Sequence, residues 1–119
     1  MKTLAALALS ISACIFLAGC QTPPKPLYDW EGYQPQVYEY FKGGSPEQQI
    51  LALERDLEVI RAHGNVPPPG YYAHLGLLYA SVGRGDQAAE MFESEKKSFP
   101  ESSAYMDFLL KKKNGKDGQ

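Results

Sequence analysis

The chain has 119 residues, and its 12 Lys and Arg side chains are slightly outnumbered by 14 Asp and Glu, which gives a formal net charge of −2. This balance excludes the strongly basic surface that nucleic-acid binding requires. Two cysteines, Cys14 and Cys20, and two histidines, His63 and His74, also leave few groups for nucleophilic catalysis or metal ligation.

Residues 1–19 have the pattern of a bacterial lipoprotein signal peptide. A positive start at Lys2 precedes an apolar run from Leu4 to Leu17, which is too short and wrongly flanked for an ordinary membrane-spanning helix. The next residues, Leu17-Ala18-Gly19-Cys20, resemble the lipobox, in which the chain is cleaved before the cysteine and that cysteine is lipidated. The alternative is an ordinary signal peptide or signal anchor with an incidental cysteine.

Cleavage at the lipobox would leave Cys20 acylated and no free thiol, so disulfides and cysteine chemistry would be excluded. Each buried acyl CH₂ contributes roughly 0.8 kcal/mol, so two or three chains anchor a protein durably. Gln21 follows Cys20, where an Asp in lipoproteins of enteric-type bacteria signals inner-membrane retention. We therefore expect an outer-membrane protein facing the periplasm. Three prolines make residues 20–27 an extended tether.

The predicted helical domain, residues 28–113, begins with an aromatic segment that runs from Tyr28 to Phe41. Pro35 can start a short helix, which Gly43-Gly44 ends. Trp30 and its tyrosine neighbours could stack on a sugar of peptidoglycan or surface polysaccharide, or bind a protein. The alternative is that these rings complete the core of the first hairpin.

The next helix starts at the capping sequence Ser45-Pro46 and ends near Gly64. Its core-facing stripe has helical spacing: Ile50, Leu53, Leu57 and Ile60. The charged residues beside the stripe are expected on a solvated face: Glu54, Arg55, Glu58 and Arg61.

The stretch from Pro69 to Ser102 resembles a tetratricopeptide repeat, which is a helical hairpin of about 34 residues. The residues that match its signature are Tyr72, Leu75, Gly76, Tyr79, Ala88, Phe92 and Pro100. Glu95 departs from the signature, because a small residue is usual there. We expect Glu95 either to widen the contact with the next helix or to mark the end of the stack.

Residues that lie about one repeat length, or about 34 positions, before and after the signature residues suggest neighbouring repeats. Tyr72 and Leu75 then correspond to Tyr38 and Phe41, and in the other direction to Met106 and Leu109. The expected fold is all-α, with tetratricopeptide-like stacked hairpins at about 35–62 and 71–98 and a closing C-terminal helix at 103–113. The apolar side of that helix is expected to hold Tyr105, Met106, Leu109 and Leu110. Residues 114–119 are expected to form a flexible tail.

No nucleophile, base and orienting group can be assembled from motif spacing, so we expect a protein that is not an enzyme, with no metal and no cofactor beyond the lipid on Cys20. Helical repeats usually bind through a concave surface. The candidate partner-binding residues are Trp30, Tyr38, Tyr71, His74 and Leu78.

Three stretches together resemble an uncharacterised family of small Gram-negative lipoproteins: residues 28–33, 66–76 and 95–102. In that family Glu95-Lys96 belongs to the motif, and members are often encoded beside two other lipoproteins, one similar to the curli secretion channel. The resemblance implies an accessory protein-interaction module of an envelope or surface-export assembly, whose partners are other envelope lipoproteins. A peptidoglycan or polysaccharide binder that uses Trp30 is the alternative.

Overall fold

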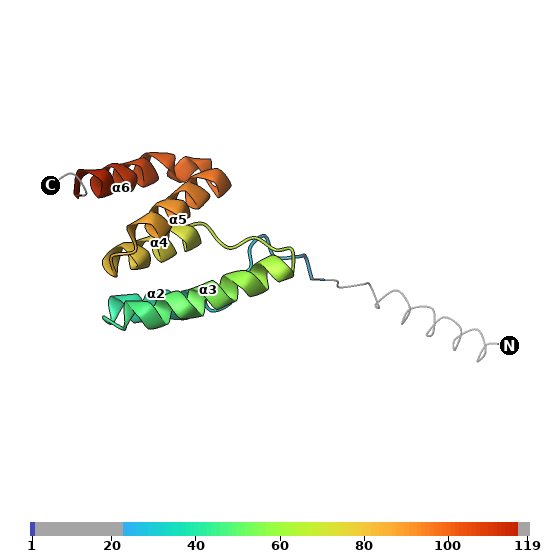
Figure 1. Ribbon diagram of the computed structural model, residues 1–119. Coiled ribbons are helices and arrows are strands. Elements are labelled where there is room, and N and C mark those ends of the chain that lie inside the picture. The colour runs from blue at the N-terminus through green and yellow to red at the C-terminus, as the bar shows by residue number, and fades with distance from the viewer. Residues whose placement is uncertain (2–22, 117–119) are drawn as a thin grey trace.

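The computed structural model describes Met1 and residues 23–116, and all the regular structure in them is helical (Figure 1). The elements are α2 (Tyr33–Phe41), α3 (Pro46–Ala62), α4 (Tyr71–Ser81), α5 (Gly85–Ser98), the 3-10 turn η1 (Pro100–Ser102) and α6 (Ser103–Lys116). The predicted all-α class is confirmed. Among these helices, none combines the length and the apolar character that crossing a membrane requires. The predicted signal peptide and Cys20 lie outside the described residues.

The helices pack in chain order, α2 on α3, α3 on α4, α4 on α5 and α5 on α6 (Figure 1). The pairs α2–α3 and α4–α5 are the two hairpins expected from the sequence. Helix α4 is the central element, and seven of its 11 residues are buried: Tyr71, Tyr72, His74, Leu75, Gly76, Leu78 and Tyr79.

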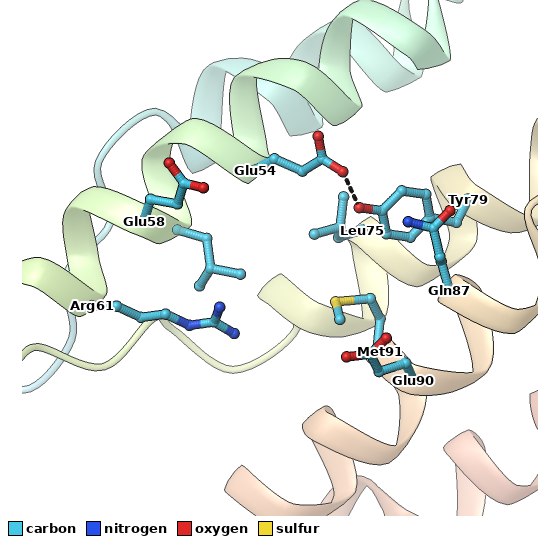
Figure 2. A pocket seen from close by; sticks show the side chains of 9 residues that line it. Glu54, Glu58, Arg61, Leu75, Tyr79, Gln87, Glu90 and Met91 are labelled. Atoms are coloured by element: carbon cyan, nitrogen blue, oxygen red, sulfur yellow. Dashed lines mark hydrogen bonds between the residues drawn. The ribbon is translucent and has the colours of Figure 1, made fainter.

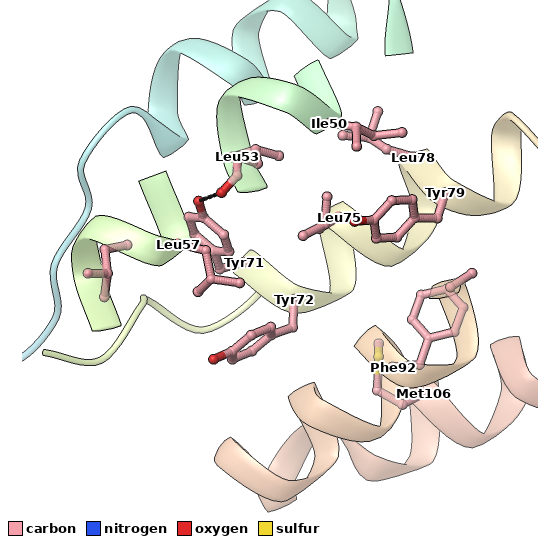
Figure 3. Packing of buried hydrophobic residues seen from close by; sticks show 12 residues of the cluster. Ile50, Leu53, Leu57, Tyr71, Tyr72, Leu75, Leu78, Tyr79, Phe92 and Met106 are labelled. Atoms are coloured by element: carbon pink, nitrogen blue, oxygen red, sulfur yellow. Dashed lines mark hydrogen bonds between the residues drawn. The ribbon is translucent and has the colours of Figure 1, made fainter. Parts of the chain in front are cut away.

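Helix α3 begins and packs as the sequence predicts. The hydroxyl of Ser45 accepts a hydrogen bond from the Gln48 N–H at 3.3 Å, and proline occupies the first turn. The predicted stripe of Ile50, Leu53, Leu57 and Ile60 is no more than 5% exposed and belongs to the main core (Figure 3). Full burial of such a side chain contributes roughly 1.5–3 kcal/mol, so this stripe holds α3 in the stack.

Helices α4 and α5 approach closely because Gly76 has no side chain. A β-carbon built on Gly76 would lie 2.6 Å from Cε1 of Phe92 and 3.2 Å from the carbonyl oxygen of Ala88. The signature residues within these two helices are all buried: Tyr72, Leu75, Gly76, Tyr79, Ala88 and Phe92. Pro100 opens η1, just after α5 ends.

Glu95 caps the start of α4 from the neighbouring helix. Its side chain is buried, and its carboxylate accepts hydrogen bonds from the N–H of Gly70 at 2.7 Å and of Ala73 at 3.3 Å. Gly70 is the N-cap and offers no side chain, so α5 supplies the acceptor that the free amides need. Within the described residues only η1 and the closing helix α6 follow α5, so the hairpin that contains Glu95 is the last one of the stack, as one of the two expectations had it.

The expected repeat register fails at the N-terminal end. Tyr38 and Phe41 are 64% and 81% exposed, although their counterparts Tyr72 and Leu75 are buried. The side of α2 that packs on α4 carries Tyr33 and Tyr40 instead, whose rings contact those of Tyr71 and His74.

The same register holds better at the C-terminal end. Met106 is buried, and Leu109 and Leu110 pack against the core beside it. Tyr105, which was expected on this apolar side, is instead 56% exposed, because it is turned by about 100° from Met106 and stacks with the exposed ring of Phe108.

Candidate interaction surfaces

The structure leaves two of the five predicted partner-binding residues at the surface. Trp30 is 45% exposed and Tyr38 is 64% exposed. Tyr71, His74 and Leu78 are buried, so their expected place on an exposed concave face is incorrect. Their side of α4 is covered by α2 and α3, and we do not carry them forward as partner-binding residues.

Tyr71 and His74 are the buried members of a cluster of rings between α2 and α4. The ring of Tyr33 lies 5.0 Å from that of Tyr71, and the ring of Tyr40 lies 5.2 Å from that of His74. The Tyr71 hydroxyl donates a hydrogen bond to the carbonyl oxygen of Leu53 on α3 at 2.7 Å (Figure 3). Burial raises the pKa of Tyr71 and lowers the pKa of His74, whose Nε2 has no hydrogen-bond partner.

The outer face of α2 carries what we call the α2 aromatic surface, formed by Tyr38 and Phe41. The two residues are three apart on one helix and therefore lie side by side. The ammonium of Lys42 lies 5.1 Å from the centre of the Tyr38 ring, and the Tyr40 ring packs edge-on against Phe41. Exposed Trp30 precedes the same helix. Large exposed rings of this kind are typical of protein interfaces.

A groove of about 430 Å³, which we call the inter-hairpin groove, lies between α3 and the α4–α5 hairpin (Figure 2). Its apolar part is formed by Leu57, Leu75, Tyr79 and Met91, and its polar part by Glu54, Glu58, Arg61, Gln87 and Glu90. Figure 2 shows Glu54, Glu58 and Arg61 along α3, facing Gln87, Glu90 and Met91 on α5.

The two ends of this groove differ in their interactions. At one end the Tyr79 hydroxyl donates a hydrogen bond to Glu54, and the Arg84 guanidinium lies 4.6 Å from the centre of the Tyr79 ring. Burial, and next the bond to Glu54, raise the pKa of Tyr79 to about 12. In the remainder of the groove, Glu58, Arg61 and Glu90 form no ion pair within residues 23–116. These charges are therefore available to a partner.

Three residues with potential metal-ligand atoms lie close together where the N-terminal segment passes the C-terminal end of α3. One donor atom each of Asp29, Glu31 and His63 lies within 4.8 Å of the other two. The Asn65 side-chain amide donates a hydrogen bond to Asp29 at 2.9 Å. Such a set suits a divalent cation. Glu31 and His63 are exposed, and no second feature points to an ion, so we base no function on this cluster.

The inter-hairpin groove was missed from the sequence because its charged residues looked like an ordinary solvated helix face. Glu54, Glu58 and Arg61 follow one another at spacings of four and three, which places them along one line of α3. That line runs beside the core stripe of α3. A row of charged residues beside an apolar stripe was the feature of the sequence that could have indicated a groove. What turns it into a groove is the approach of α5, which depends on tertiary packing.

Comparison with known proteins identifies a family. The family described as "Domain of unknown function (DUF4810)" matches residues 27–109, a stretch that runs from the end of the predicted tether into α6. This agrees with the uncharacterised family expected from the sequence. No curated protein and no solved structure matches the chain significantly.

Proposed function

The chain belongs to the DUF4810 family, a family of unknown function, and we propose that it is an outer-membrane lipoprotein that acts as a non-enzymatic protein-interaction module. The observation that carries this proposal is the α2 aromatic surface. Tyr38 and Phe41 are 64% and 81% exposed, which is more than any other aromatic side chain of residues 23–112.

Exposing two neighbouring rings costs free energy that a partner could recover. A fully buried aromatic side chain removes about 150–250 Å² from water. At about 25 cal/mol per Å², covering the exposed parts of both rings would contribute several kcal/mol. Tyrosine and tryptophan are also enriched among the residues that dominate binding energy. The rigid helix fixes both rings before binding, which limits the entropy lost on association.

The lipid anchor would place this surface close to membrane partners. Acylation at Cys20 and the proline-rich tether of residues 20–27 would hold the domain near the bilayer on the periplasmic side. Tethering raises the effective concentration of the surface without adding contacts. The expected partners are other envelope lipoproteins, including the curli-secretion-channel-like neighbour that the sequence resemblance implies, and the role is that of an accessory subunit in an envelope or surface-export assembly.

Site-specific photocrosslinking in cells tests this proposal. A photoreactive amino acid at Tyr38 or Phe41 should give a discrete protein adduct, and one at Lys97, an exposed position on α5, should not. The double substitution Tyr38→Ser and Phe41→Ser should abolish capture by the native partner, whereas Leu51→Ser, at a residue that is 67% exposed on α3, should leave it intact. Equal adducts at all positions, or none, would refute the surface.

The anchor is tested separately with labelled palmitate. Incorporation should depend on Cys20, and a Cys20→Ala variant should leave the outer-membrane fraction. Palmitate labelling that survives Cys20→Ala would contradict the lipobox assignment.

A further inference from the structure

The outer face of α6 presents two aromatic rings followed by two lysines. Tyr105 and Phe108 are 56% and 57% exposed, and their rings stack with centres 6.3 Å apart and an interplanar angle of 17°. Lys111 and Lys112 are exposed on the next turn. From Tyr105 to Lys112 this face is about 10 Å long, at 1.5 Å per residue.

The inter-hairpin groove has matching length and opposite charge. From Glu54 to Arg61 its α3 wall also spans about 10 Å. Glu54 and Glu58 stand on this wall, Glu90 stands on the α5 wall, and Arg61 closes the far end. Between the walls lies the apolar surface of Leu57 and Met91, with the soft thioether of methionine well suited to aromatic rings.

An antiparallel arrangement of the two faces brings most of these features together, with Glu54 already paired with Arg84 at 3.9 Å. With α6 running opposite to α3, Lys112 lies near Glu54, and Phe108 lies over the turn of Leu57. Tyr105 then reaches the Arg61 guanidinium, which is a favourable cation–ring pairing. Lys111 points to the second wall and to Glu90. The parallel arrangement would instead place the lysines against Arg61.

We propose that the inter-hairpin groove of one copy receives α6 of a second copy, so that the chain associates head to tail. A copy cannot fill its own groove in this way, because its α6 packs on α5 and η1 with Met106 inward. When only one such contact joins two copies, it repeats from copy to copy and produces rings or linear arrays.

The contact is small, so it should be weak in dilute solution and significant where copies are concentrated. A short helix face covers less than the roughly 800 Å² per partner of a stable interface. This inference goes beyond the proposed function, since it uses a different surface from Tyr38 and Phe41.

Reciprocal charge reversal tests the proposal on the detergent-solubilised full-length chain. The groove variant carries Glu58→Lys and Glu90→Lys, and the helix variant carries Lys111→Glu and Lys112→Glu. All four side chains are unpaired in the described structure, so the fold should be kept, which circular dichroism can check. Lys25→Glu with Lys97→Glu is the control variant at exposed sites elsewhere, with the same charge change as the helix variant.

Sedimentation over a concentration series should show association of the wild type and of the control. Each reversed variant alone should associate at least about tenfold more weakly. Lys111 and Glu90 repel once either charge is reversed, and reversing Glu58 or Lys112 also removes attraction along the α3 wall. An equal mixture should regain association, because the reversed groove of the first variant attracts the reversed helix of the second. The unchanged groove of the second also attracts the unchanged helix of the first, so the two variants should alternate in the assembly. Salt should weaken the wild-type contact.

Three results would overturn the proposal. The first is a wild type that is monomeric at every concentration. The second is weaker association of the helix variant alone, which would indicate contact between two α6 helices. The third is a mixture that does not regain association. Partner capture at Tyr38 is read independently of these variants, so the failure of one proposal is distinguishable from the failure of the other.

Discussion

The cap that Glu95 provides should outweigh the cost of burying its carboxylate. The carboxylate satisfies two amides at the start of α4, and hydrogen bonds to charged groups contribute about 1.5–3 kcal/mol each. Against this stands a desolvation penalty of several kcal/mol for a buried ion, which the positive end of the helix dipole offsets in part. Loss of a cap typically costs about 0.5–2 kcal/mol, and the cavity left by the side chain adds to it.

We therefore expect Glu95→Ala to lower the free energy of unfolding by about 3 kcal/mol and Glu95→Gln by about 1 kcal/mol, because Gln keeps one acceptor. Urea unfolding followed by circular dichroism measures both. For a domain of this size a loss of 3 kcal/mol lowers Tm by more than about 10 °C.

The matched control is Glu93→Gln on the same helix. The Glu93 side chain is 59% exposed and pairs with Lys96 at 3.4 Å, so its loss should change stability by less than about 0.5 kcal/mol. The reasoning is refuted if Glu95→Ala is as stable as the wild type. A more stable variant would mean that desolvation outweighs the cap, as it does at some buried ion pairs.

Three further changes test the packing of α4. Gly76→Ala should cost about 1–3 kcal/mol despite the better helix propensity of alanine, because its β-carbon meets Phe92, and Phe92→Leu in the same chain should recover part of the loss in a thermal melt. Burial lowers the folded-state pKa of His74 below its ordinary 6.5. The stability that depends on the neutral ring is therefore present above pH 6.5 and is lost as the pH falls through the folded-state pKa. His74→Phe should reduce the loss of Tm on acidification, and an unchanged dependence of Tm on pH would contradict this. Tyr71→Phe should cost about 1 kcal/mol in urea unfolding through the lost bond to Leu53, and a cost near zero would show that this bond contributes nothing net.

The local part of the fold could be predicted because it rests on periodicity and helix ends. The α3 stripe follows from apolar residues at helical spacing, and the Ser45 cap follows from a hydroxyl before proline. The α4–α5 hairpin follows from the signature residues around Gly76. These features depend on neighbours within a few positions of the sequence, where the pattern is direct.

The interactions between elements could not be predicted in the same way. The cap on α4 comes from Glu95, which is 25 residues from Gly70, and a buried glutamate looks like a surface residue in a sequence. The orientation of α2 was mistaken because a fixed repeat length was carried over to a helix that packs on α4 through Tyr33 and Tyr40. Of the predicted partner residues, Trp30 and Tyr38 are exposed, whereas Tyr71, His74 and Leu78 are covered by that same helix and by α3.

The way the N-terminal segment joins the domain determines how the domain carries mechanical load. The Asp29 N–H donates a hydrogen bond to the carbonyl oxygen of Val66 at 2.8 Å, and the ring of Tyr28 packs edge-on against Phe99, 5.9 Å away. A pull on the N-terminal end is therefore shared at once between the α3–α4 connector and the end of α5. Force would not peel α2 away first, and the two hairpins would resist it together.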